Sequence, residues 1–310
     1  MRIIHISDPH LSSLDNVRWS QLRGKRMLGY QSWYRKRRRQ FTVDTLEVLT
    51  QAVRGESANL VIISGDLVQI GLERELLEAR AWLERLGGPD EVLVTPGNHD
   101  CYHPESWPLV QRIYRPYLGT RNETDPPGDY PVLRHANGVS VIAASSAAPA
   151  PWWAASGTLG VDQRTRLARM LHDERENLRF LVLHHPPLPG MASVRKALTD
   201  AHALKAILEE TRPQITLHGH LHRNQALITP QGRIFCTAPA SSARRRVPAS
   251  YRVFEISTQR DSWQIDMTLK SLVQGTITTI EETSWNAARA FESGHTHSLD
   301  SGESDDAGPQ

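Results

Sequence analysis

Residues 92–100 read Val92-Leu93-Val94-Thr95-Pro96-Gly97-Asn98-His99-Asp100. A short apolar run rich in valine and leucine is typical of a buried strand, and here it ends directly in a glycine and three polar side chains. Four other apolar runs end in the same way, in carboxylate, imidazole or amide groups. They are residues 3–7 before Asp8-Pro9-His10, 60–64 before Gly65-Asp66, 180–183 before His184-His185-Pro186, and 215–217 before His218-Gly219-His220-Leu221-His222.

Helical patterns lie between these runs and antiparallel strand patterns follow them. We expect helices over residues 41–54, 73–86, 162–173 and 200–210. After Gly219 the pattern changes to a hairpin and to strand-like alternation, as in Trp263, Ile265, Met267 and Leu269. The order is that of a layered α/β domain, which we expect over residues 1–283. Residues 284–310 are acidic and poor in apolar side chains, which predicts a disordered tail.

The polar residues are expected to meet at one edge of the fold. Ligands of open α/β sheets gather at the carboxyl ends of the strands, and five strand ends here deliver metal-binding groups. Imidazole with carboxylate suits Mn, Fe, Zn or Co, and these motifs contain no cysteine. Two such ions can hold the attacking and leaving oxygens of a displacement at phosphorus. The pattern therefore indicates a centre of two divalent ions.

Taken in order, the five motifs resemble the signature of the calcineurin-like metallophosphoesterase superfamily, over roughly the first 225 residues. The resemblance implies an α/β fold, a four-layer α/β/β/α sandwich with the metals between the strand ends. It also implies the ligands. They are Asp8, His10 and His222 for one ion, Asn98, His184 and His220 for the other, and Asp66 as a bridge between both.

The same resemblance implies a catalytic arrangement. A hydroxide between two metals, of which manganese is the first expectation and Fe, Zn or Co the alternatives, attacks phosphorus. His99 stabilises or protonates the departing oxygen, and Asp100 orients His99. The family pattern makes the first histidine of His184-His185 the ligand, so His185 is expected to line the substrate pocket.

A basic and aromatic insertion follows the first motif. Residues 18–39 contain nine Lys or Arg and no acidic residue, whereas the whole chain has a net charge of +2. The apolar residues Trp19, Leu22, Tyr30 and Trp33 share roughly one helical face, although Gly24 and Gly29 weaken a continuous helix. Three interpretations remain open. The segment contacts an anionic membrane surface, steers a nucleotide or, less in keeping with the sequence, nucleic acid, or is a solvated face of a cap.

The substrate is less determined than the chemistry. The basic segment favours a membrane-associated nucleotide-lipid such as UDP-diacylglucosamine, and the alternatives are cyclic AMP and a non-catalytic binding module. Two subgroups are similar, the UDP-diacylglucosamine hydrolases and the class III cyclic-nucleotide phosphodiesterases. With two cysteines, no signal-like start and no long apolar run, we expect a cytoplasmic protein, peripheral on the inner face of the membrane if the lipid interpretation holds.

Overall fold

The computed structural model describes residues 1–11, 13–119 and 130–289. Two six-stranded sheets dominate it, with strand orders β14-β13-β12-β1-β2-β3 and β4-β5-β6-β7-β9-β8. The first sheet consists of β1 (Arg2–Ile6), β2 (Leu60–Ile63), β3 (Val92–Val94), β12 (Ser250–Thr258), β13 (Ser262–Val273) and β14 (Thr276–Ala288). The second consists of β4 (Val132–Ala136), β5 (Val139–Ala143), β6 (Leu178–Val182), β7 (Ile215–His218), β8 (Gln225–Thr229) and β9 (Gly232–Cys236).

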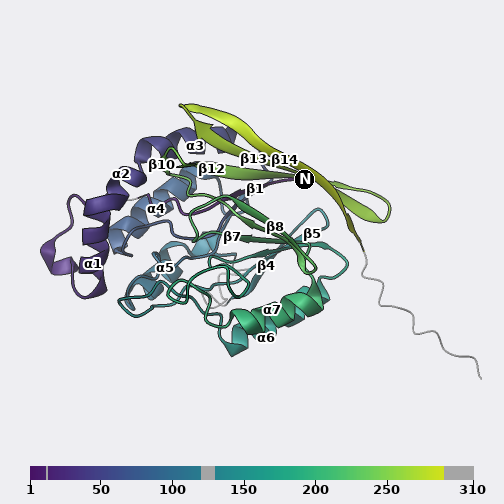
Figure 1. Cartoon of the computed structure of the whole chain (residues 1–310), viewed down its shortest axis with the longest axis horizontal. Helices are drawn as coiled ribbons and strands as arrows, with labels where there is room; N and C mark the ends of the chain where they lie inside the picture. The colour runs from purple at the N-terminus through teal and green to yellow at the C-terminus, as the bar shows by residue number, and fades with distance from the viewer. Residues whose placement is uncertain (12, 120–129, 290–310) are drawn as a thin grey trace, which may run out of the picture.

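Helices cover the outer faces of the two sheets (Figure 1). Helices α3 (Val43–Gly55) and α4 (Glu73–Leu86) bury apolar stripes in the same core as β1 and β2, and α5 (Ser106–Ile113) packs beside α4. Helices α6 (Val161–Asp173) and α7 (Ala201–Thr211) lie together on the second sheet, where they form an apolar cluster with β5 and β6. The expected four-layer α/β/β/α sandwich is confirmed.

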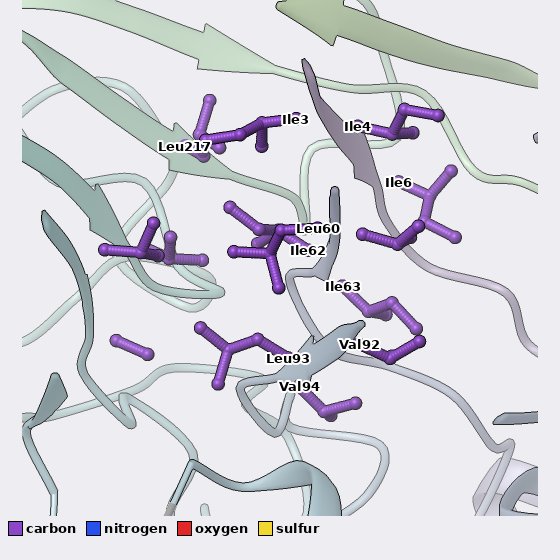
Figure 2. Packing of buried hydrophobic residues seen from close by; sticks show 14 of the residues in the cluster. Ile3, Ile4, Ile6, Leu60, Ile62, Ile63, Val92, Leu93, Val94 and Leu217 are labelled. Atoms are coloured by element: carbon purple, nitrogen blue, oxygen red, sulfur yellow. The ribbon is translucent and has the colours of Figure 1, made fainter. Parts of the chain in front are cut away.

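The core between the sheets explains why the strands are so apolar. Figure 2 shows side chains of β1 on opposite faces, with Ile3 directed towards Leu217 of the second sheet and Ile4 and Ile6 directed away from it. Both faces of β1 and β2 are therefore covered, and every residue of β2 is buried. Strands with two covered faces need continuous rather than alternating apolar residues.

The strand directions place the polar motifs. β1, β2 and β3 are mutually parallel, as are β5, β6, β7 and β9. The parallel strands of each sheet thus end on one side of that sheet, and the loops after β1, β2, β3, β6 and β7 carry the five motifs.

One boundary differs from the sequence-based expectation. Strand β14 continues to Ala288 by pairing with β13, so residues 284–288 are strand rather than tail; the ladder hydrogen bonds outweigh their polar composition. The remainder of the expected tail, residues 290–310, lies outside the described residues. Among the residues that are described, no helix has the length and apolarity needed to cross a bilayer.

The basic insertion is helical and folds back onto the protein. It contains η1 (Trp19–Gln21), α1 (Lys25–Ser32), the π-helical turn η2 (Trp33–Arg37) and α2 (Arg38–Gln40), and its helices are labelled α1 and α2 in Figure 1. We call residues 18–39 the cap segment. Two smaller elements complete the chain. They are the 3-10 turn η3 (Arg115–Tyr117) and the hairpin of β10 (Ala243–Arg244) and β11 (Val247–Pro248).

Candidate metal centre

Two groups of ligating side chains form where the motif loops meet. One group is Asp8, His10, Asp66 and His222, and the other is His184, His185 and His220. In each group the ligand atoms lie within 4.8 Å of one another. The loops after β1 and β2 of one sheet therefore converge with those after β6 and β7 of the other.

Asp8 is held so that one carboxylate oxygen is free. Its Oδ2 accepts hydrogen bonds from the Ser7 hydroxyl at 2.6 Å and from the backbone N–H of His220 at 3.1 Å. Its Oδ1 is buried without a hydrogen-bond partner and lies 3.0 Å from Nε2 of His222 and 3.8 Å from Nε2 of His10. A buried carboxylate oxygen left unpaired costs free energy unless a cation or donor occupies the space it faces.

Asp66 lies between the two groups. Its Oδ1 accepts the backbone N–H of His99 at 2.7 Å. Its Oδ2 lies 3.3 Å from Nε2 of His184 and 4.0 Å from Nε2 of His10, which belong to different groups. The side chain is 1% exposed. Asp66 is thus within reach of both groups, as a carboxylate shared by two ions would be.

Backbone carbonyls set the orientation of two of the imidazoles. Nδ1 of His10 lies 3.2 Å from the carbonyl of Val68, and Nδ1 of His184 lies 2.7 Å from the carbonyl of Ser64. A carbonyl only accepts, so Nδ1 carries the proton and donates. The lone pair of Nε2 is then directed at the centre, as in metal-bound histidines whose other nitrogen is held by the protein.

Neighbouring nitrogens have the spacing of ligands on one ion. Nε2 of His10 and Nε2 of His222 are 3.2 Å apart, as are Nδ1 of His220 and Nε2 of His184. Ligands about 2.1 Å from a tetrahedral ion lie roughly 3.4 Å from one another. Oδ1 of Asn98 completes the second group, 3.2 Å from Nε2 of His184. The donor set and its spacing therefore fit two divalent cations.

The backbone is strained where it presents these side chains. Five of the candidate ligands adopt the left-handed conformation that non-glycine residues rarely take, with φ between 42° and 66°. They are Asp8, His10, Asp66, His220 and His222. Close approach also demands glycine at Gly97, where an added Cβ would collide with the Asp66 carboxylate. Strain concentrated at one place indicates a functional site.

Charge is balanced within the centre by the histidines. Burial alone would raise the pKa of Asp8, but the electrostatic interaction with the neighbouring His222 outweighs it and holds the pKa at about 2. Burial likewise opposes ionisation of Asp66, and His184 outweighs it, so the pKa of Asp66 is well below its usual value. In return, burial would lower the pKa of His184 but Asp66 raises it to about 9. In the protein without bound metal, the proton on His184 therefore supplies positive charge beside Asp66.

Uptake of Mn²⁺ is expected to release about one proton near neutral pH, because His184 must give up its proton before Nε2 can bind a metal. Its pKa is raised to about 9 in the metal-free protein, so the apparent metal affinity should fall as the pH falls below that value, by about tenfold per unit. Calorimetric titrations with Mn²⁺ in two buffers of different ionisation enthalpy measure the proton release. Equal apparent enthalpies in both buffers at pH 7 would contradict it.

A family model and curated relatives agree with this geometry. The model for calcineurin-like phosphoesterases matches residues 1–224, which contain all five motifs. The chain belongs to the calcineurin-like phosphoesterase family. It is 30% identical over 193 residues to the glycerophosphodiester phosphodiesterase GpdQ of Enterobacter lignolyticus (strain SCF1), covering 60% of this chain and 63% of that protein. The chain thus spans less than two thirds of that relative's length.

A second relative and a solved structure extend the comparison. The chain is 30% identical over 220 residues to a probable cyclic nucleotide phosphodiesterase of a Synechococcus strain, covering 68% of this chain and 77% of the relative. A purple acid phosphatase from yellow lupin (Lupinus luteus) superposes with a TM-score of 0.57 at 10% identity, over 94% of this chain and 54% of that one. The latter shows a shared fold. Binuclear metal dependence is general for the family, and this chain has the candidate ligands.

The family motif places His99 at the centre, but Asp100 does not orient its ring. Nδ1 of His99 contacts the carbonyl of Gln69, and the Arg37 guanidinium lies 3.1 Å from Nδ1 and 3.2 Å from Nε2. The Asp100 carboxylate instead accepts the backbone N–H groups of Asp66, Leu67 and Gly97 at 2.8–3.0 Å. The expected role of Asp100 is corrected. It ties the Gly65-Asp66 turn to the Gly97-Asn98 turn, because a buried carboxylate takes the nearest unpaired donors.

His185 also differs from its expected position. It is fully buried, its Nδ1 lies 2.8 Å from the Ser146 hydroxyl, and its Nε2 lies 3.2 Å from the carbonyl of Ala155. Both nitrogens thus face the protein rather than a substrate pocket. The ring lies tilted by 44° against that of His220, with centroids 4.5 Å apart. His185 therefore packs against His220, and its two hydrogen bonds hold the loop of residues 144–157 in place.

Three residues outside the five motifs reach the centre. The ring of Phe41 lies 4.7 Å from that of His10 and 5.5 Å from that of His222. Arg244, the first of three consecutive arginines, donates to the backbone carbonyl of His222 at 3.3 Å. Arg37 reaches His99 from the cap segment. A run such as residues 35–39 shows that basic groups are present, but no sequence signal selects Arg37 among them.

Proposed function

We propose that the protein hydrolyses a phosphodiester bond with two divalent ions, manganese first among them. Asp8, His10 and His222 would hold one ion, Asn98, His184 and His220 the other, and Asp66 both. The position of the Asp66 carboxylate between the two groups carries the proposal. The curated relatives are named as a glycerophosphodiester phosphodiesterase and a probable cyclic nucleotide phosphodiesterase, which supports a diester over a monoester.

When bound, the ions would supply Lewis acidity towards the phosphoryl oxygens and activate water for attack. The chain itself orients and encloses the reactants. Its carbonyls fix the imidazoles of His10 and His184, and His99 presents its ring beside them, 4.9 Å from that of His10. The leaving oxygen would be stabilised by His99. Buried surroundings strengthen each of these electrostatic interactions, because little water screens them.

A diester carries a second substituent on phosphorus, and the structure offers a place for it. A cavity of about 580 Å³ is lined in part by Arg244, which also donates to the backbone carbonyl of His222. Arg245 and Thr45 add polar groups to its lining, and Pro248 and Leu272 add apolar ones. A substituent with both anionic and apolar parts would suit this lining. We propose that the cavity receives the substrate's larger arm.

A membrane-associated nucleotide-lipid such as UDP-diacylglucosamine is the second candidate substrate, and the outer surface of the cap segment favours it. Trp19 is 73% exposed and Tyr34 51% exposed, beside the exposed basic residues Arg35, Lys36 and Arg39. Aromatic and basic side chains together suit an anionic lipid surface. On this proposal the protein is cytoplasmic and binds peripherally to the inner face of the membrane. Leu22 and Trp33 are buried, which leaves less apolar surface for a bilayer than the sequence suggests.

The test compares substrates on Mn²⁺-loaded protein. We expect turnover of bis(p-nitrophenyl) phosphate to exceed that of p-nitrophenyl phosphate. Among natural compounds, glycerophosphodiesters, cyclic AMP and UDP-diacylglucosamine in mixed micelles are assayed in parallel, and binding to anionic liposomes is followed by sedimentation. Turnover of the lipid with sedimentation supports the second candidate, whereas turnover of a soluble diester without sedimentation excludes it. Full metal content without turnover of any of these would make the protein a binding module.

A further inference from the structure

The basic residues of the cap segment do not form one uniform surface. Arg35, Lys36 and Arg39 are exposed. Arg26 is buried and donates to the carbonyls of Ile70 and Gly71, so it anchors the cap segment. Arg37 alone among them contacts a residue of the metal centre in the described structure, through His99. It therefore has a different role from its neighbours in the sequence.

A local helix irregularity aims Arg37 inwards. Residues Trp33–Arg37 form a π-helical turn between α1 and α2. Such turns are rare and frequently occur at functional sites, because the extra residue per turn re-directs side chains. Trp33, at the start of this turn, is 3% exposed and packs with Leu22, Ile70 and Tyr102. This apolar anchor fixes the turn and thereby the position of Arg37.

Close packing of α1 supports the same arrangement. Gly29 lies within this helix, where a Cβ would collide with Ile70 and with the Tyr102 hydroxyl. Its carbonyl accepts from Nη2 of Arg37 at 3.1 Å. At the other end of α1, Lys25 donates to the carbonyls of Ala150 and Ala154. The cap segment is thus hydrogen-bonded to two separate loops, at residues 70–71 and at residues 150–154.

The guanidinium of Arg37 has more N–H donors than it uses in hydrogen bonds to the protein. It carries five N–H groups; Nη1 reaches His99, Nη2 reaches Gly29, and Nε is buried without a hydrogen-bond partner. None of the ion pairs among the described residues includes Arg37. The Arg37 side chain is partly buried and its Nε is fully enclosed. A cation in such surroundings without a carboxylate partner is costly, and an anion bound beside it would offset that cost.

We propose that Arg37 binds a non-bridging oxygen of the phosphoryl group at the metal centre. The inference rests on the proposed function, since it places the phosphoryl group of the substrate at the metals. A planar guanidinium with several unused donors matches phosphate geometry. Through its contact with His99 it would hold that ring and the phosphoryl group in one hydrogen-bonded cluster. The cap segment thus contributes a substrate-binding residue that the five motifs lack.

Binding of inorganic phosphate to the Mn²⁺-loaded protein tests the inference without turnover. We expect Arg37→Ala to weaken phosphate binding by about tenfold or more in calorimetric titration, as loss of a charge-assisted hydrogen bond does. Arg37→Lys, which keeps the charge but not the fork, should lie between the two. The matched control is Arg35→Ala, an exposed position in the same turn, which should bind phosphate as the wild type does. Metal content and melting temperature are measured for each variant.

Wild-type affinity in a folded, metal-loaded Arg37→Ala protein would overturn the inference and make Arg37 a strut of the cap segment. If that variant does not fold, the Nε–Hε resonance of Arg37 in the wild type loaded with diamagnetic Zn²⁺ decides. The resonance is identified by its absence in Arg37→Lys. Phosphate should shift it, and an unmoved resonance at saturating phosphate would equally overturn the inference. The two proposals can fail separately. If the protein hydrolyses no diester but its phosphate binding still depends on Arg37, the proposed function is refuted and the role of Arg37 in phosphate binding stands.

Discussion

Replacement of Asp66 by asparagine is expected to remove both metal ions together and to lower diester turnover by roughly 10³-fold or more. The Oδ2 of Asp66 faces His184 of one group and His10 of the other. An amide there has no charge, and one of its ends is a donor, which repels a cation. Because the same side chain serves both groups, neither ion retains its full set of ligands.

Metal analysis by mass spectrometry and diester turnover measure the effect, with Asp90→Asn as the matched control because Asp90 is an exposed carboxylate far from the motifs. The control should keep two ions per chain and full turnover. An Asp66→Asn protein that still holds two ions and turns over at the wild-type rate would refute the shared ligand. Loss of a single ion would limit Asp66 to one group.

Gly219→Ala is expected to have the second largest effect, on both metal binding and stability. A Cβ at this position would collide with the hydroxyl of Ser7 and with Oδ2 of Asp8. These two atoms are hydrogen-bonded to each other at 2.6 Å at the end of β1, so they cannot move apart without releasing Asp8. Overpacking of this kind costs about 1–3 kcal/mol. We expect lower metal content, a turnover reduced by about 10²-fold, and a lower melting temperature.

Gly55→Ala is the matched control, because a Cβ there meets no atom within 4 Å. It should keep metal content, turnover and melting temperature close to those of the wild type. Thermal unfolding is followed with and without Mn²⁺, since a lost metal and a strained backbone both lower the melting temperature but only the former abolishes the gain from added metal. A Gly219→Ala protein that gains as much from Mn²⁺ as the wild type contradicts the steric argument.

The clustering of the candidate ligands could be predicted because each motif is local. A strand–loop boundary is encoded by adjacent residues, such as the apolar run before Gly97 and the polar groups after it. The family pattern then supplied the partners across the two sheets. The structure brings Asp8, His10, Asp66 and His222 into one group and His184 and His220 into another.

The roles of Asp100 and His185 could not be predicted in the same way. The sequence suggested that Asp100 orients the ring of His99, the residue directly before it. The Asp100 carboxylate instead accepts hydrogen bonds from the backbone N–H groups of Asp66, Leu67 and Gly97. His185 follows a ligand directly, yet both its nitrogens bond to residues 146 and 155. A buried polar group is satisfied by whatever lies nearest in space, and that information is tertiary.

The sequence by itself determined the layered α/β fold, the family and the set of candidate ligands, because apolar periodicity and strand-end motifs are local properties. Only the tertiary structure decided the position and contacts of each residue in the cap segment. It buried Trp33, used Arg26 as an anchor, aimed Arg37 at His99 and left Arg35 in solvent. These residues share one composition and one stretch of chain. What separates them is the docking of α1 on Ile70 and Tyr102 and the π-helical turn, both of which arise from packing between distant segments.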